Sequence, residues 1–164
     1  KIKTIKNKDK TPYMQELELQ LETLEKGGYD HFMIKEIHEQ PRVIRDTLAG
    51  RVLSTEPGVS LGLNLPSKEQ PKSILLLACG TAYHACLVGE HFLSSISPWR
   101  VSARIASELE LPRSTEKGSW AIALSQSGET ADTIAAARAA RNAGYFTLAL
   151  TNNVDRVISR ILGK

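Results

Sequence analysis

The sequence has few of the features that mark secreted, membrane or nucleic-acid-binding proteins. Two cysteines in 164 residues do not form a disulfide framework, so we expect reduced thiols and a cytoplasmic protein. We expect neither a signal peptide nor a membrane span, because no apolar run in the sequence is long enough to cross a membrane. Aromatic residues make up only 5% of the chain and the formal net charge is +3, so we expect no nucleic-acid surface. The first residue is Lys1 and not Met, which leads us to expect a piece of a longer protein.

Cofactor-binding motifs are equally scarce. The chain has neither the Gly-x-Gly-x-x-Gly of dinucleotide sites nor the Gly-Lys-Ser/Thr of nucleotide triphosphate sites. Cys79, His84, Cys86 and His91 are metal-ligating types, but His84 and Cys86 are two residues apart and would diverge on a helix. We therefore expect no metal and no nucleotide cofactor.

The N-terminal part of the chain predicts a tail followed by helices. Five lysines within residues 1–10 indicate a solvated linker or tail. Thr11-Pro12 predicts a helix start, and a second helix is expected from about residue 30 to 48, interrupted or kinked at Pro41. Residues 51–70 contain scattered Gly, Pro and Ser and predict a loop.

From Lys72 onward, strand patterns alternate with helix patterns. The expected strands cover residues 73–78, 99–105, 120–124 and 145–150, and the expected helices cover 83–95, 131–143 and about 154–162. This order predicts an α/β fold, a three-layer sandwich in which helices flank a parallel sheet. We therefore divide the chain into a tail (1–10), a helical lead-in with a loop (11–70) and an α/β domain (71–164).

The segment from Ser125 to Thr130 is the strongest candidate for a ligand site. It joins an apolar strand to a helix, where unpaired backbone N–H groups and the helix dipole favour an anion. Its hydroxyl and amide side chains add donors, and a second small loop, 79–82, is expected at the same edge of the sheet. On composition alone, helix capping is the favoured explanation of the hydroxyls. Glu129 would repel a phosphate unless it points away or has a cationic partner.

Three stretches in the right order resemble a known family. Residues 125–133 (SQSGETADT) and 78–85 (ACGTAYHA) resemble the sugar isomerase (SIS) domain, specifically that of glutamine–fructose-6-phosphate aminotransferases, with a flavodoxin-like fold. Residues 30–41 resemble the segment that joins the glutaminase and isomerase parts of those enzymes, and Ala106-Ser107-Glu108 also falls at a similar stretch. The resemblance covers about residues 11–153 and favours a phosphate site over simple capping.

The resemblance implies a set of residues that bind a sugar phosphate. These are Thr81, Ser125, Gln126, Ser127 and Thr130. Ala82 stands where the family usually has Ser, which removes one hydroxyl. No catalytic residue is assigned, because Glu108 and His84 are better explained as surface or capping groups.

The family's reaction converts fructose 6-phosphate and glutamine into glucosamine 6-phosphate and glutamate. Its glutaminase domain and second SIS unit have no counterpart in this sequence, nor is a fifth strand of the first unit evident. We therefore expect a first SIS unit that is inactive by itself and associates as a homodimer. The alternative is a non-catalytic sugar-phosphate-binding module, such as a sensor within a regulator.

Overall fold

The computed structural model describes residues 2–3, 9–10, 25–52, 58–60, 71–112, 115–153 and 157–158. The chain divides into two compact units, Lys1–Asn64 and Leu65–Lys164, and each is described by itself. The helix predicted from Thr11 lies outside the described residues. So do most of the loop 51–70 and most of the last predicted helix, of which 157–158 are helical.

The first unit contains two very short strands and one long helix. Strand β1 (Ile2–Lys3) pairs antiparallel with β2 (Asp9–Lys10), within the stretch expected to be a tail. Helix α2 (Phe32–Leu48) is not interrupted at Pro41, because proline removes only one N–H donor and the flanking hydrogen bonds persist. The Pro41 carbonyl also accepts a bond from Arg45 Nε at 3.2 Å.

The second unit is built on a parallel sheet of four strands. Strands β3 (Ser73–Ala78), β4 (Arg100–Ile105), β5 (Ser119–Leu124) and β6 (Phe146–Leu150) lie in the order β4-β3-β5-β6. Every pairing is parallel, which confirms the predicted α/β sandwich. Each strand begins or ends within one residue of its predicted position.

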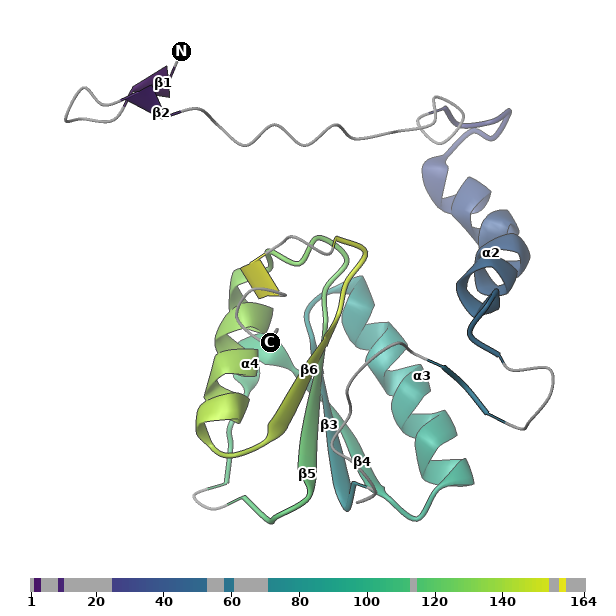
Figure 1. Cartoon of the computed structure of the whole chain (residues 1–164). Helices are drawn as coiled ribbons and strands as arrows, with labels where there is room; N and C mark the ends of the chain where they lie inside the picture. The colour runs from purple at the N-terminus through teal and green to yellow at the C-terminus, as the bar shows by residue number, and fades with distance from the viewer. Residues whose placement is uncertain are drawn as a thin grey trace. The chain divides into compact units, whose positions relative to one another are not determined.

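Helices cover both faces of this sheet (Figure 1). Helix α3 (Thr81–Ile96) packs mainly on β3 and β4, while α4 (Ala131–Asn142) packs on β5, β3 and β6. A 3₁₀ turn, η1 (Ala106–Glu108), follows β4 and contacts α4. Helix α3 starts two residues before its predicted start, because Gly80, at φ 58°, turns the chain directly from β3 into the helix.

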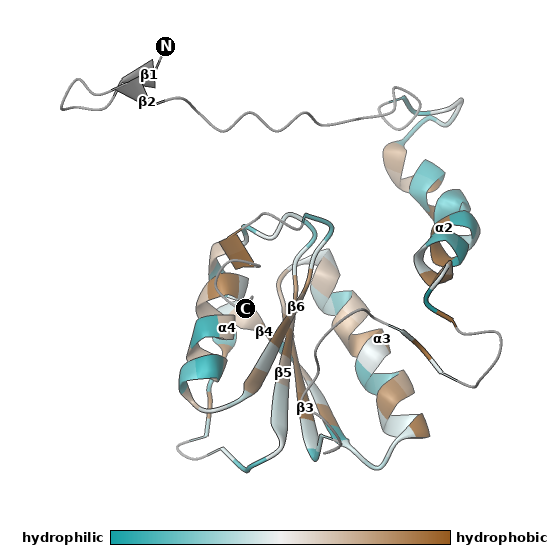
Figure 2. Ribbon diagram, in the orientation of Figure 1, coloured by the Kyte–Doolittle hydropathy of each residue, from teal (hydrophilic) through white to brown (hydrophobic). Residues whose placement is uncertain are grey.

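Side chains of β3 alternate between two apolar cores. Leu75 and Leu77 pack with the alanines of α4 in one cluster. Ile74 and Leu76 pack with buried Cys86 of α3 in the other. The strands are accordingly among the most apolar parts of the unit (Figure 2), as expected for a sheet buried on both faces.

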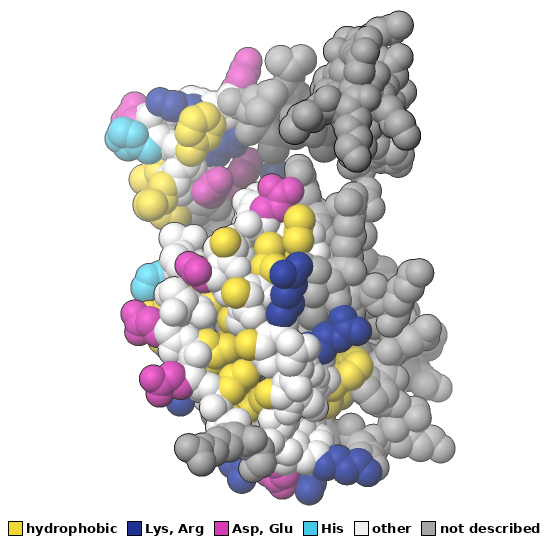
Figure 3. Space-filling view, turned by 90° about the vertical axis from the view of Figure 1, so that its left-hand side faces the viewer, with side chains coloured by type: hydrophobic (Ala, Val, Ile, Leu, Met, Phe, Trp, Pro, Cys, Tyr) yellow, Lys and Arg dark blue, Asp and Glu magenta, His cyan; other side chains and the backbone are white. Residues whose placement is uncertain are grey.

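The outer side of α4 carries small side chains. Residues 131, 135 and 139 are alanines that lie exposed one turn apart. Apolar side chains therefore reach the surface on the side of the molecule shown in Figure 3.

Candidate functional site

The two loops identified in the sequence both follow the carboxyl ends of strands in the sheet. β3 and β5 are neighbours and parallel, so their carboxyl ends lie side by side (Figure 1). Cys79-Gly80 connects β3 to α3, and residues 125–130 connect β5 to α4. This topology brings Thr81, at the start of α3, to the same edge as the 125–130 loop. Ligands of open α/β sheets bind at this edge.

The 125–130 loop is folded by its own hydroxyl groups. Ser125 is 4% exposed, and its Oγ accepts a hydrogen bond from the Gly128 N–H at 3.0 Å. The same oxygen lies 3.1 Å from Thr130 Oγ1, and Ser127 Oγ accepts from the Glu129 N–H at 3.2 Å. Gly128 has φ 70°, a left-handed conformation that favours glycine.

The hydroxyl of Thr130 is not used as a helix cap. Thr130 occupies the N-cap position of α4, yet its side chain makes no capping hydrogen bond and contacts Ser125 instead. Thr81 is already the first helical residue of α3, whose N-cap is Gly80. Gln126 and Glu129 are exposed.

A third segment, which the sequence did not single out, also reaches the loop. Thr151 Oγ1 donates to the Gln126 carbonyl at 3.4 Å. Asn153 Nδ2 lies 3.4 Å from the Gln126 carbonyl and 3.5 Å from that of Ser127. Thr151 and Asn153 follow β6, so their position after a neighbouring parallel strand was the available signal.

The other candidate residues lie on α3 and in η1. His84 and Glu108 are exposed, in keeping with surface roles. Cys86 is fully buried, and burial raises the pKa of its thiol to about 11. Within the ranges that the structure describes, no group of three His, Cys, Asp or Glu side chains is arranged to hold a metal ion.

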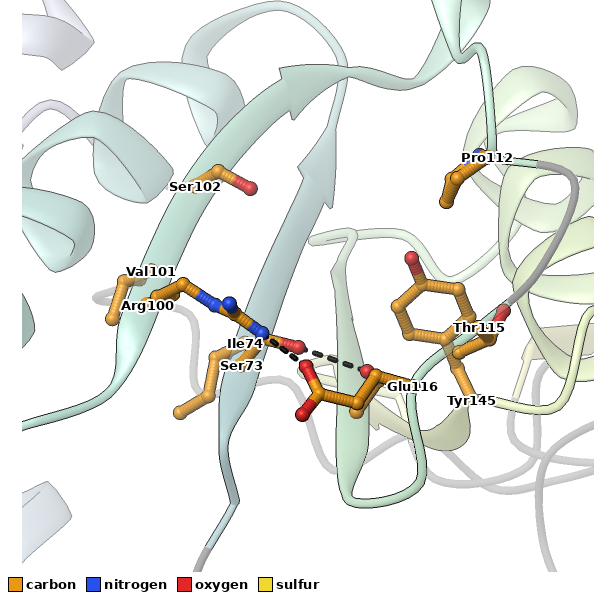
Figure 4. A pocket seen from close by; sticks show the side chains of 10 residues that line it. Ser73, Ile74, Arg100, Val101, Ser102, Pro112, Thr115, Glu116 and Tyr145 are labelled. Atoms are coloured by element: carbon orange, nitrogen blue, oxygen red, sulfur yellow. Dashed lines mark hydrogen bonds and ion pairs between the residues drawn. The ribbon is translucent and has the colours of Figure 1, made fainter.

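A hollow of about 310 Å³ lies at the amino ends of the strands, opposite the candidate loops (Figure 4). Its lining includes Ser73, Arg100 and Ser119, the first residues of β3, β4 and β5. Arg100 and Lys72 both pair with Glu116, and the Arg100 hydrogen bond is the main cause of the lowered pKa of that carboxyl group. The hollow is therefore separate from the loops at the carboxyl ends of the strands.

Known proteins are similar to this chain in sequence and in fold. A family model described as the SIS domain matches residues 69–161. The chain is 44% identical to a glutamine–fructose-6-phosphate aminotransferase [isomerizing] from Caldanaerobacter subterraneus subsp. tengcongensis, over 88% of the chain and 24% of that protein. It is 47% identical to the enzyme of the same name from Clostridium tetani, over 83% of the chain and 23% of that protein. The chain thus spans about a quarter of the length of these relatives.

Solved structures show the same relationship. The C-terminal domain of glucosamine-fructose-6-phosphate aminotransferase from Francisella tularensis superposes with a TM-score of 0.69 and 31% identity. The match covers 83% of this chain and 39% of that domain. A glucosamine-6-phosphate deaminase from Thermotoga maritima shares the fold, with 18% identity and a TM-score of 0.59; the match covers 79% of this chain and 38% of the deaminase chain.

In the described part of the chain, no helix has the length and apolar character needed to span a membrane.

Proposed function

Because the chain belongs to the SIS domain family, we propose that its 125–130 loop binds the phosphate group of a phosphorylated sugar. The observation that carries the proposal is the loop itself: the hydroxyls of Ser125, Ser127 and Thr130 gather with backbone N–H groups where α4 begins, and the Thr130 hydroxyl does not cap the helix. The positive end of the helix dipole adds to the attraction for an anion. The proposed ligand-binding residues are Thr81, Ser125, Gln126, Ser127 and Thr130.

We further propose that the parent protein is a glutamine–fructose-6-phosphate aminotransferase. The support is the identity of more than 40% to relatives of that name over most of the chain. In this proposal the first SIS unit holds fructose 6-phosphate, while a glutaminase domain and a second SIS unit supply the remaining chemistry. The isolated chain is then inactive, homodimeric through its SIS units and cytoplasmic. The names of these relatives favour an enzyme over a sensor module.

Calorimetric titration with glucose 6-phosphate at low salt, with glucose as the control, tests the phosphate site. Saturable binding of the phosphorylated sugar alone is the expected result. Ser127→Ala and Thr130→Ala should each weaken binding by about 1–3 kcal/mol, the scale of a hydrogen bond to a charged group. Ser107→Ala, at an exposed serine of η1, is the matched control and should leave affinity unchanged. Equal binding of glucose and glucose 6-phosphate would rule out a phosphate site.

A further inference from the structure

Three consecutive carbonyl groups of the 125–130 loop are held from the segment that follows β6. Thr151 Oγ1 and Asn153 Nδ2 donate to the Gln126 carbonyl, both at 3.4 Å. Asn153 Nδ2 also reaches the Ser127 carbonyl at 3.5 Å, and the Ile158 N–H donates to the Gly128 carbonyl at 3.2 Å. Thr151 and Asn153 are 25 and 27 positions from Gln126 in the sequence. Their hydrogen bonds therefore join two loops that follow neighbouring strands of the sheet.

Holding a carbonyl also sets the direction of the next N–H group. The C=O and N–H of one trans peptide point in opposite directions, and the described residues contain no cis peptide bond. Anchoring the carbonyls of residues 126–128 therefore directs the N–H groups of residues 127–129 away from the anchors. Successive N–H groups that point to a common side form an anion-binding concavity.

The observed hydrogen bonds agree with this geometry. The N–H groups of Gly128 and Glu129 donate to the hydroxyls of Ser125 and Ser127. Both hydroxyls therefore lie on the side away from the anchored carbonyls. The Ser127 N–H has no partner among the described residues, which leaves a donor for a ligand on that side.

We propose that Thr151 and Asn153 are positioning residues for phosphate binding, which turn the carbonyls of the loop away from the anion and its N–H groups toward it. This inference rests on the proposed function. A carbonyl oxygen that faced the phosphate would repel it. Each hydrogen bond from Thr151 or Asn153 is long and therefore weak, so the carbonyls are held by these bonds acting together. Both acceptors are carbonyls, so the side-chain amide must present its nitrogen to them.

The main test replaces the donor by an acceptor of the same shape. Asn153→Asp turns an amide into a carboxylate that repels both carbonyls, whereas Asn152→Asp makes the same charge change at the exposed neighbouring residue. We expect Asn153→Asp to weaken binding of glucose 6-phosphate and of inorganic phosphate by about tenfold, the effect of two lost hydrogen bonds. Asn152→Asp should cause a much smaller loss. Equal losses in the two variants would overturn the inference.

A rescue experiment separates positioning from general stability. Thr151→Val removes the hydroxyl and should weaken binding about threefold, whereas Thr151→Ser keeps the hydroxyl and should bind like the original protein. Thermal unfolding of each variant shows whether the fold is intact. If Thr151→Ser loses as much affinity as Thr151→Val, the hydroxyl is not the anchor.

A ligand-free measurement keeps this inference distinct from the proposed function. In Asn153→Asp, the backbone amide NMR signals of residues 127–129 should shift, while in Asn152→Asp they should stay in place. Unchanged signals in Asn153→Asp would overturn the positioning role whether or not a phosphate binds. Failure of the original protein to bind glucose 6-phosphate would overturn the proposed function instead.

Discussion

At the scale of single residues, Thr133 carries a buried hydroxyl group with no hydrogen-bond partner among the described residues. It is 0% exposed in the first turn of α4. A buried unpaired hydroxyl lowers stability, and valine has the same shape without it. Thr133→Val should therefore raise the free energy of unfolding by about 1 kcal/mol, measured by urea denaturation. A lower free energy of unfolding would show that the hydroxyl has a partner, such as an ordered water.

The two cysteines should differ sharply in reactivity. Burial raises the pKa of the Cys86 thiol from 9.0 to about 11, whereas Cys79 is half-buried. Only about one Cys86 in a thousand is a thiolate at pH 8, and the thiolate is the nucleophile. Iodoacetamide at pH 8 should therefore alkylate Cys79 first and Cys86 only after unfolding, as followed by peptide mass spectrometry. Faster labelling of Cys86 would contradict the packing of α3 against β3.

The same pKa shift links Cys86 to the pH dependence of stability. Because the folded state favours the neutral thiol, the contribution to stability is fully present below about pH 9 and is lost as the pH rises through about 11. In Cys86→Ser, the loss of folding stability that this thiol causes between about pH 9 and pH 11 should be absent.

At the scale of elements, Glu90 joins a helix to an edge strand. β4 is one of the two edge strands of the sheet, and its Ala103 N–H donates to Glu90 Oε2 of α3 at 3.1 Å. Removing the acceptor leaves a partly buried donor unpaired, so Glu90→Ala should lower the free energy of unfolding by about 1–2 kcal/mol. Glu90→Gln keeps an oxygen acceptor and should lose less.

Urea denaturation measures this effect against a matched variant. Glu110→Ala removes a carboxylate from an exposed position and should leave stability nearly unchanged. Equal stability of Glu90→Ala and Glu110→Ala would show that the bond to Ala103 contributes nothing to the fold.

The elements that the sequence predicts best are those buried on both sides. β3 reads as an unbroken apolar run because neighbours cover both of its faces, and its bounds of 73–78 are as predicted. The start of α3 was predicted two residues late, because the backbone angle at Gly80 is set by the turn from β3 and not by apolar periodicity. Of the interruption or kink expected at Pro41, the interruption is wrong, because one missing donor does not end a helix.

The candidate site was predictable only in part. The hydroxyls of the 125–130 loop stand together in the sequence, so their chemistry is visible there. Thr151 and Asn153 are 25 and 27 positions from Gln126, whose carbonyl they hold, and no local pattern links them. Their contact arises from the parallel pairing of β5 with β6, a property of the folded sheet.

At the scale of the whole molecule, the described cores and the candidate site belong to one of the two units. Every residue of both apolar clusters, and both loops at the carboxyl ends of the strands, lies within Leu65–Lys164. A chain of residues 65–164 alone should therefore unfold cooperatively and keep the phosphate site. In both the full and the shortened chain, glucose 6-phosphate at about 100 times its dissociation constant should stabilise the fold by about 2.7 kcal/mol, and glucose should not.

Differential scanning calorimetry of the two chains, with each sugar, measures this stabilisation directly. A shortened chain that folds but is not stabilised by glucose 6-phosphate would show that residues 1–64 contribute to the site. A shortened chain that does not fold would show that the first unit supports the core. Equal stabilisation of both chains would assign phosphate binding to the second unit, because mass action depends only on affinity for the folded state.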